Sequence, residues 1–396
     1  MRVAFVHYWL VSMRGGEQVL EALSDLYPQA DIFTLVYDEK KISEKLKRHK
    51  ITPSFLQRIP GAVAHYKKLL PLMPFALESF DLSSYDLVIS SESGPAKGII
   101  PAPDAVHICY CHSPMRYVWD HYHTYRANSG TVSRALMPLF APRLRQWDVS
   151  TSARVDVFVA NSHHVQHRIA KYYRRSSKVV SPPVQVQNFL PAEVSGDFYL
   201  CAGQLVRYKR VDLAVEAFKL NGKKLVVVGE GEEMARLKAT ATPNITFLGR
   251  VPFNKLKELL SQCRALVFPG EEDFGITPVE AMASGRPVIA YGRGGVMDTI
   301  IPNKTGVLFE DQSTEGLLQA IEYFEAMEGQ FEPLLIRQHA QQFSAEEFKG
   351  KMRTIVEVEL DRRASQKAHN SASLTEYWAH EQFEGLSSGP NAALVQ

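Results

Sequence analysis

The sequence predicts an α/β protein made of two Rossmann-like domains that face a central cleft. At 396 residues the chain is long enough for about two domains. Apolar, β-branched runs alternate with helical patterns in two series along the chain, which is typical of doubly wound parallel sheets. Two consecutive prolines, Pro182 and Pro183, form a stiff connector between the two series. We therefore place one domain over residues 1–183 and a second over residues 184–345.

The elements of each series follow from the apolar patterns. The first domain is expected to have strands at 2–10, 31–37, 86–90, 105–111 and 155–160. The second is expected to have strands at 197–203, 224–229, 244–248, 264–268 and 287–290, with helices near 210–220, 231–240, 254–262 and 277–284. The tail over 363–396 is polar and unpatterned, and we expect it to be loosely ordered.

The composition favours a globular protein of the cytoplasm. A net charge of +2 argues against bulk nucleic-acid binding. The four cysteines have no framework spacing, which fits a reducing compartment better than secretion. No apolar run is long enough to span a membrane, and Met1-Arg2 leads into a strand without a secretory leader.

The most informative stretch is FPGEEDFGITPVEAMASGRPVIA, residues 268–290. A strand ends in an acidic loop, and the helix that follows has Thr277, Pro278 and Glu280 at the N-cap, N1 and N3 positions of a capping box. Gly275, between strand and helix, lets backbone N–H groups converge on a phosphate at the helix N-terminus. The stretch therefore predicts either a phosphate-binding site or simply a well-capped helix.

Two glutamates eight positions apart, Glu272 and Glu280, flank this predicted pocket. Carboxylates repel a phosphate, so they suit the sugar hydroxyls on either side of it. The spacing alone leaves open that Glu280 only caps its helix and that the acidic loop is merely solvated.

The first domain offers its own candidates at strand ends. Gly15 and Gly16 stand between a strand and a helix, where they indicate either a phosphate cradle or a tight turn. His112 follows the strand 105–111, at the edge where doubly wound sheets bind ligands. Cys109 and Cys111 precede it, but C-x-C-H is poor zinc spacing and no second ligand pair follows, so we expect no metal.

The E-x7-E pair followed by EAMASGRPVIA resembles the signature of retaining glycosyltransferases of the GT-B fold, in the large family numbered four. The resemblance implies that Glu272 lies near the transferred sugar and that Glu280 binds the ribose of a nucleotide. It implies that Gly275 and Ile276 bind the diphosphate.

The resemblance extends to the first domain. Gly15 and Gly16 match a glycine pair that faces the donor diphosphate across the cleft. The run CHSPMRYVWD resembles mannosyltransferases of the same family, which implies that His112 contacts the donor sugar and makes Arg116 a candidate for acceptor contact. A last helix, over 346–362, is expected to cross back to this domain.

The segment GQLVRYKRVD, residues 203–212, resembles the family's diphosphate-clamping loop. Lys209 matches the lysine of that loop, whereas the position of the family's arginine holds Gln204. One cation is therefore missing, and we expect Arg207 or Arg210 to replace it. From the residues alone, a solvated cationic loop is the alternative.

The resemblance implies a retaining hexosyltransferase that moves mannose from GDP-mannose onto a lipid-linked saccharide or polysaccharide precursor. Glu272, His112 and Lys209 are then the catalytic residues, and neither a metal nor another cofactor is expected. A UDP-hexose donor is the alternative within the class. Outside it, a non-catalytic sugar-nucleotide-binding subunit is the rival, which Gln204 favours. A nicotinamide-dependent oxidoreductase lacks support because no complete G-x-G-x-x-G follows the first strand.

Two basic, apolar segments are candidates for contact with an anionic membrane. One is KKLLPLMPFALESF, residues 67–80, and the other is 131–154, which contains Arg134, Arg143, Arg145 and Arg154. The alternative is a solvated helix face for both, with core packing for 67–80, and 131–154 is also a candidate for an acceptor-facing surface. We therefore expect a cytoplasmic protein with peripheral contact at the inner face of the cell membrane.

Overall fold

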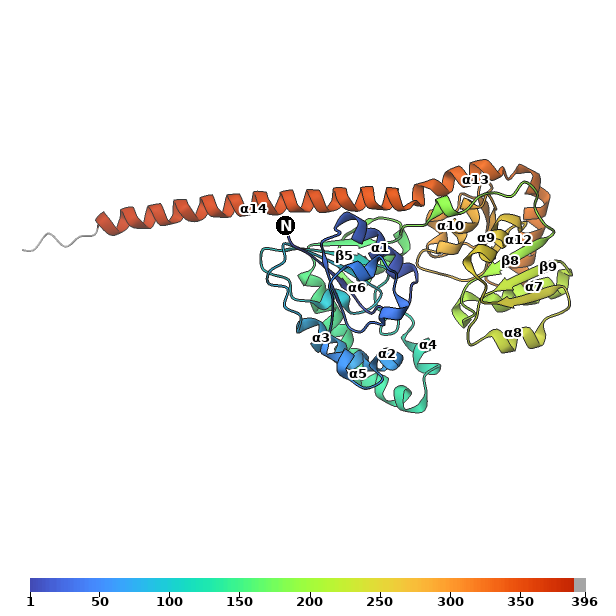
Figure 1. Ribbon diagram of the computed structural model, residues 1–396, viewed down its shortest axis with the longest axis horizontal. Helices are drawn as coiled ribbons and strands as arrows, with labels where there is room; N and C mark the ends of the chain where they lie inside the picture. Colours follow the sequence, from blue (N-terminus) through green and yellow to red (C-terminus); the bar gives the residue numbers. More distant parts are fainter. Residues whose placement is uncertain (388–396) are drawn as a thin grey trace, which may run out of the picture.

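A computed structural model of the protein describes the backbone of residues 1–387 and the side chains of residues 1–369. Within this range the chain forms two parallel sheets, each surrounded by helices (Figure 1). The predicted α/β class with two doubly wound domains is confirmed. Among the described helices, none is both long and apolar enough to cross a bilayer.

The first sheet has seven strands in the order β3-β2-β1-β4-β5-β6-β7. Its strands are β1 (Val3–His7), β2 (Asp31–Thr34), β3 (Ile51–Pro53), β4 (Leu87–Glu92), β5 (Val106–Cys111), β6 (Val157–Ala160) and β7 (Ser177–Val179). Its helices are α1 (Gly15–Leu26), α2 (Ala62–His65), α3 (Met73–Glu78), α4 (Tyr122–Ala127), α5 (Thr131–Thr151) and α6 (His163–Tyr173). Strand β3 was not predicted; it is a short, half-buried strand at the edge of the sheet, where its terminal proline is tolerated.

The second sheet has six strands in the order β10-β9-β8-β11-β12-β13. Its strands are β8 (Phe198–Ala202), β9 (Lys224–Val228), β10 (Ile245–Gly249), β11 (Leu266–Phe268), β12 (Val288–Tyr291) and β13 (Gly306–Phe309). The helices of this part are α7 (Val211–Asn221), α8 (Met234–Thr240), α9 (Phe253–Gln262), α10 (Ile276–Ala283), α11 (Val296–Thr299), α12 (Thr314–Met327) and α13 (Pro333–Ala340), and the chain continues into α14 (Ala345–Ser387).

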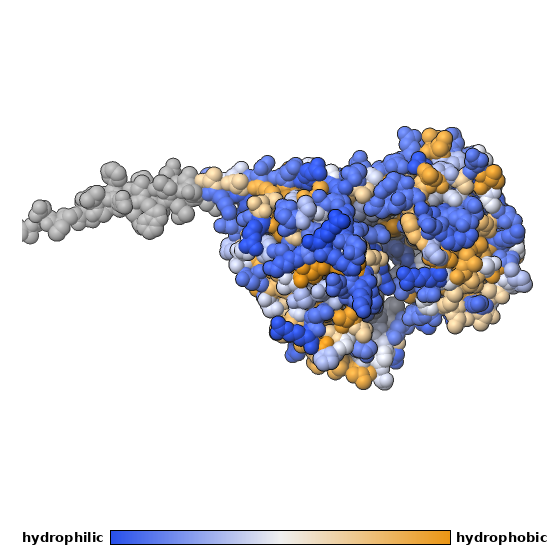
Figure 2. All heavy atoms as spheres, in the orientation of Figure 1, coloured by the Kyte–Doolittle hydropathy of each residue, from blue (hydrophilic) through white to orange (hydrophobic). Residues whose placement is uncertain are grey.

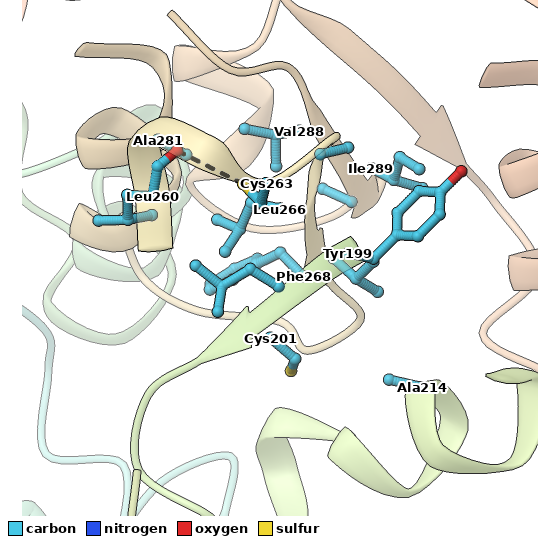
Figure 3. Packing of buried hydrophobic residues seen from close by; sticks show 14 of the residues in the cluster. Tyr199, Cys201, Ala214, Leu260, Cys263, Leu266, Phe268, Ala281, Val288 and Ile289 are labelled. Atoms are coloured by element: carbon cyan, nitrogen blue, oxygen red, sulfur yellow. Dashed lines mark hydrogen bonds between the residues drawn. The ribbon is translucent and has the colours of Figure 1, made fainter. Parts of the chain in front are cut away.

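Strands β8, β11 and β12, inside the second sheet, are apolar along their whole length, as expected for strands that helices cover on both faces. Leu266, Phe268, Val288 and Ile289 of β11 and β12 pack with Tyr199 of β8 in one buried cluster (Figure 3). This core holds the carboxyl end of β11 in place, from which the acidic loop starts.

The chain passes twice between the domains, and the two passages lie side by side. The backbone N–H of Val184 donates to the carbonyl of Phe343 at 2.9 Å, and Val184 forms an isolated parallel bridge with Ser344. Helix α14 then begins at Ala345 and runs along the first domain (Figure 1). Its residues Phe348 and Met352 are buried in the core of that domain, so α14 ties the end of the chain to the first sheet.

The expected loosely ordered tail over 363–396 is wrong through Ser387, because α14 continues as a helix to that residue. The segment from 351 to 384 contains neither glycine nor proline, and a helix already nucleated on the first domain can propagate through such a segment. Residues 388–396 lie outside the described residues.

Candidate active site

The candidate site lies where the carboxyl ends of the two sheets face each other. Doubly wound sheets bind ligands at the point where the strand order reverses. In the first sheet this point lies between β1 and β4, and in the second it lies between β8 and β11. Figure 2 shows that the surface is hollowed between the two domains. The predicted residues follow these strands or their immediate neighbour β5.

Helix α10 begins earlier than the sequence predicted, so the capping box is wrong. Gly275 is the N-cap, with a φ of 88°, and Ile276 is the first helical residue. The left-handed conformation, which glycine adopts at little cost, turns the chain into the helix before Thr277. Glu280 therefore lies one turn inside the helix and not at N3.

The half-buried Glu280 side chain has no hydrogen-bond or ion-pair partner among the described side chains. Burial raises its pKa to about 7. An unpaired carboxylate in such a position is costly for the free protein, and a ligand hydroxyl can satisfy it.

Lys209 and Glu272 form an ion pair across the switch point of the second sheet. The Nζ of Lys209 lies 2.7 Å from Oε1 of Glu272, and both side chains are largely buried. Burial opposes the charge of Lys209, but the attraction of Glu272 outweighs it and raises the lysine pKa. The pair lines a small pocket together with Gln204. The pocket therefore contains a lysine that stays protonated beside the carboxylate of Glu272.

Neither arginine proposed to replace the missing cation lies in this pocket. Arg207 is 66% exposed, and its Nε is 3.4 Å from Oε1 of Glu233. Arg210 pairs with Asp212 at the start of α7. The replacement of the family's arginine by one of these residues stays a prediction.

The first domain brings its glycine pair and His112 to the same place. A Cβ on Gly15 would lie 2.8 Å from Cδ1 of Ile276, so the start of α1 touches the start of α10. A Cβ on Gly16 would lie 3.6 Å from Nε2 of His112. That nitrogen is 2.9 Å from Oγ of Ser91. Burial lowers the pKa of His112 to about 4, so the imidazole is neutral near pH 7.

Arg116 contacts the second domain. Its Nη2 lies 2.5 Å from Oδ1 of Asp273, the residue after Glu272, and Nη1 of Arg168 lies 2.8 Å from the same oxygen. The sequence analysis named neither Asp273 nor Arg168 as a site residue. The acidic loop was a usable signal for Asp273, whereas nothing in the sequence around Arg168 on α6 marks it.

Residues 187–356 match the family model described as Glycosyl transferases group 1. We refer to this part of the chain as the group 1 domain, after the family model that it matches. A GDP-mannose-dependent alpha-mannosyltransferase of Mycolicibacterium smegmatis is 38% identical over 120 residues, which are 30% of this chain and 32% of that protein. The alpha-1,3/1,6-mannosyltransferase ALG2 of Saccharomyces cerevisiae is 24% identical over 382 residues, covering 79% of this chain and 73% of its own. Four curated relatives, the M. smegmatis protein among them, are matched over only 28–48% of their own length.

Solved structures extend the similarity beyond the group 1 domain to the fold of both domains. Sucrose-phosphate synthase from Thermosynechococcus elongatus has a TM-score of 0.68 at 16% identity, covering 91% of this chain and 100% of that one. HepE from Anabaena in complex with UDP has a TM-score of 0.66 at 14% identity, covering 90% and 100%. These neighbours confirm the predicted GT-B fold, and at such identities they show the fold alone.

Proposed function

We propose that the protein is a glycosyltransferase that moves a hexose from a sugar nucleotide bound in the cleft. One observation carries the proposal. The Lys209–Glu272 pair, with an Nζ–Oε1 distance of 2.7 Å, lines a pocket of the group 1 domain at the switch point of its sheet. A cation suits the diphosphate and a carboxylate suits the sugar hydroxyls, so the pair matches the two halves of such a donor.

The second domain holds the donor in this proposal. Glu280 accepts hydrogen bonds from the ribose hydroxyls, and the N-terminus of α10, with Gly275 and Ile276, binds the diphosphate. Glu272 positions the hydroxyls of the sugar. Lys209 stabilises the negative charge that develops on the departing diphosphate. A second cation from Arg207 or Arg210 completes the clamp.

The first domain closes the site from the other side. Gly15 and Gly16 allow the start of α1 to approach the diphosphate without side chains between them. His112 contacts the sugar as a neutral imidazole, which suits its lowered pKa of about 4. Arg116 is the proposed contact for the acceptor.

The proposed reaction is a front-face displacement that retains the anomeric configuration. The bond between the anomeric carbon and the diphosphate oxygen breaks, and a bond from that carbon to the acceptor oxygen forms on the same face. The proton of the acceptor hydroxyl goes to the departing diphosphate oxygen, so no enzyme nucleophile is required. Exclusion of water from the cleft limits hydrolysis of the donor.

GDP-mannose is the donor we propose, because the M. smegmatis protein and ALG2, to which the chain is similar, are both named as mannosyltransferases. A UDP-hexose is the alternative, supported by the UDP complex of HepE. Nucleotide release should be measured with a panel of GDP- and UDP-sugars, with and without EDTA. Turnover with GDP-mannose that EDTA leaves unchanged is the expected result, and turnover with UDP-sugars alone would reject GDP-mannose.

The ribose role of Glu280 predicts a pH dependence of donor binding. Below its pKa of about 7 the carboxyl is protonated and loses its charge-assisted hydrogen bonds, so donor affinity is expected to fall as the pH falls from about 8 to 5.5, by up to about tenfold per unit. His112, with a pKa of about 4, stays neutral over this range. Calorimetric titration of GDP-mannose, whose diphosphate does not titrate there, checks the slope. Glu280→Gln should bind more weakly and without the slope, and an equal slope in this variant would contradict the role.

The proposed acceptor is a lipid-linked saccharide, and the first domain has a surface suited to a membrane. Exposed apolar residues gather at its lower end in Figure 2, where Figure 1 places α3 and α5. They include Phe75 at 67% exposed and Leu139 at 56%. Basic residues lie beside them on the same segments, namely Lys67, Lys68, Arg134 and Arg143. We propose peripheral contact of this surface with the cytoplasmic face of the membrane.

The double variant Phe75→Asp, Leu139→Asp is expected to lower binding to vesicles with anionic lipid by about tenfold or more, because each side chain loses apolar contact with the bilayer. Co-sedimentation measures the effect. The matched control is Leu220→Asp, since Leu220 is 70% exposed on α7 of the other domain. Equal binding by both variants would contradict the proposed surface.

A further inference from the structure

The acidic loop sends two successive side chains to opposite domains. Glu272 contacts Lys209 within the group 1 domain, at 2.7 Å. Asp273 contacts Arg116 and Arg168 of the first domain, at 2.5 Å and 2.8 Å. The loop that carries the proposed catalytic carboxylate is therefore also a place where ion pairs join the two domains.

One of the two arginines that hold Asp273, Arg168, is itself held by further contacts. The side chain of Arg168 is only 8% exposed, and its Nη2 pairs with Oδ1 of Asp120 at 2.7 Å. Its Nη1 also donates to Oγ of Ser113 at 2.5 Å. Burial alone would raise the pKa of Asp273, but Arg116 and Arg168 outweigh it and lower that pKa. Asp273 is thus an ionised carboxylate that pairs with two arginines, and such charge-assisted hydrogen bonds are strong.

The backbone of the loop is held from both sides. Oγ of Ser162, the N-cap of α6, donates to the carbonyl of Asp273. On the other side, the backbone N–H of Gly295 donates to the carbonyl of Glu272 at 2.8 Å. A Cβ on Gly294 would lie 2.3 Å from that carbonyl oxygen, so the loop and the turn after β12 are in close contact. The carbonyls of Asp273 and Glu272 are therefore held by hydrogen bonds from different domains, and we expect a shift of Asp273 to move the adjacent Glu272.

The same contacts reach His112. Nδ2 of Asn161 donates to the carbonyl of His112 at 3.0 Å, and the adjacent Ser162 gives its hydroxyl proton to the carbonyl of Asp273. Asn161 and Ser162 thus connect the segment that carries His112 to the loop that carries Glu272.

We propose that Asp273 is a positioning residue that places Glu272 and His112 opposite each other only when the domains are closed. This inference rests on the proposed transferase function. The group formed by Asp273, Arg116 and Arg168 is here called the latch. When the latch is made, the cleft is closed around the donor and the acceptor oxygen is the nucleophile within reach. When it is broken, the donor stays bound to the group 1 domain but its sugar is open to water.

The test compares Asp273→Ala, Asp273→Asn, Arg168→Gln and the double variant Asp273→Ala, Arg168→Gln with the wild-type protein. Lys171→Gln is the matched control, since Lys171 lies exposed on the same helix as Arg168. Transfer, hydrolysis and nucleotide affinity are measured with GDP-mannose, and small-angle scattering reports the mean separation of the domains. Melting curves ensure that only folded variants are compared.

Asp273→Ala is expected to lower kcat for transfer by about 10–100-fold, because a displacement of about 1 Å is enough for such a loss. Nucleotide affinity should stay within about threefold, while the hydrolysed fraction of the donor and the radius of gyration both rise. Asp273→Asn should be intermediate, and the double variant should be no worse than the worse single variant, as for residues that act together.

The two proposals fail in distinguishable ways. If the wild-type protein transfers no sugar from any donor, the proposed function fails, and the scattering of Asp273→Ala alone decides whether the latch closes the domains. If the wild type transfers sugar but Asp273→Ala matches Lys171→Gln in kcat, hydrolysed fraction and radius of gyration, the latch is overturned.

Discussion

Replacing Glu272 with alanine is expected to lower kcat for hexose transfer by about 10²–10³-fold, while nucleotide affinity stays within about threefold. In the proposed site this carboxylate acts on the sugar, whereas the nucleotide is held by Glu280 and the start of α10. The free energy of unfolding is expected to fall by about 1–3 kcal/mol, because the change leaves the largely buried Lys209 without its ion-pair partner. Steady-state kinetics and urea denaturation check the two halves of the expectation.

Glu271→Ala is the matched control for this variant. Glu271 precedes Glu272 in the same loop, but its side chain is 44% exposed, and its one ion pair within the described part of the chain is with His164, at 3.7 Å. Its kcat should stay within about threefold of the wild type. If Glu272→Ala retained wild-type kcat, or if Glu271→Ala fell as far, Glu272 would not be the residue that acts on the sugar.

Replacing Lys209 with methionine is expected to lower kcat by about 10²–10³-fold as well. Methionine keeps the length of the side chain and removes the charge, so the departing diphosphate loses its main cation. Nucleotide affinity should also weaken, by about tenfold, because the diphosphate is charged in the bound donor too. Lys219→Met, on α7 and paired with Glu216 outside the pocket, is the control.

Gln204→Arg tests whether the pocket is a phosphate clamp. Gln204 lines the pocket beside Lys209. It stands where the diphosphate-clamping loop of the glycosyltransferase family has an arginine. Adding this cation is expected to tighten donor binding and to recover part of the kcat lost in Lys209→Met. A Lys209→Met variant with wild-type kcat, or a Gln204→Arg variant with weaker donor binding, would contradict the clamp.

The sequence predicted those parts of the fold and the site that depend on neighbouring residues. Buried strands and the glycines that follow them are local patterns, and the structure brings Lys209, Glu272, Gly16 and His112 to the facing edges of the two sheets. The error in the start of α10 also has a local cause: Gly275, with a φ of 88°, is the N-cap in place of the predicted Thr277.

The parts that the sequence did not predict depend on contacts between distant segments. β3 is a strand because β2 lies beside it, and α14 extends past 362 because its first turns are docked on the first domain. The latch joins Arg168 to Asp273, 105 positions away, and no pattern within α6 indicates that contact. Likewise, only the structure shows that Arg207 and Arg210 already have carboxylate partners.

The central claim is that this chain transfers a hexose with the Lys209–Glu272 pocket as its donor site. The most direct measurement follows radiolabelled mannose from GDP-mannose into organic-extractable lipid of bacterial membranes, with GDP release measured in the same reaction. The wild-type protein should transfer label and release an equal amount of GDP, and Glu272→Ala should do neither above background. Tight binding of every tested GDP- and UDP-sugar with neither transfer nor hydrolysis would contradict the claim and identify a non-catalytic sugar-nucleotide-binding subunit.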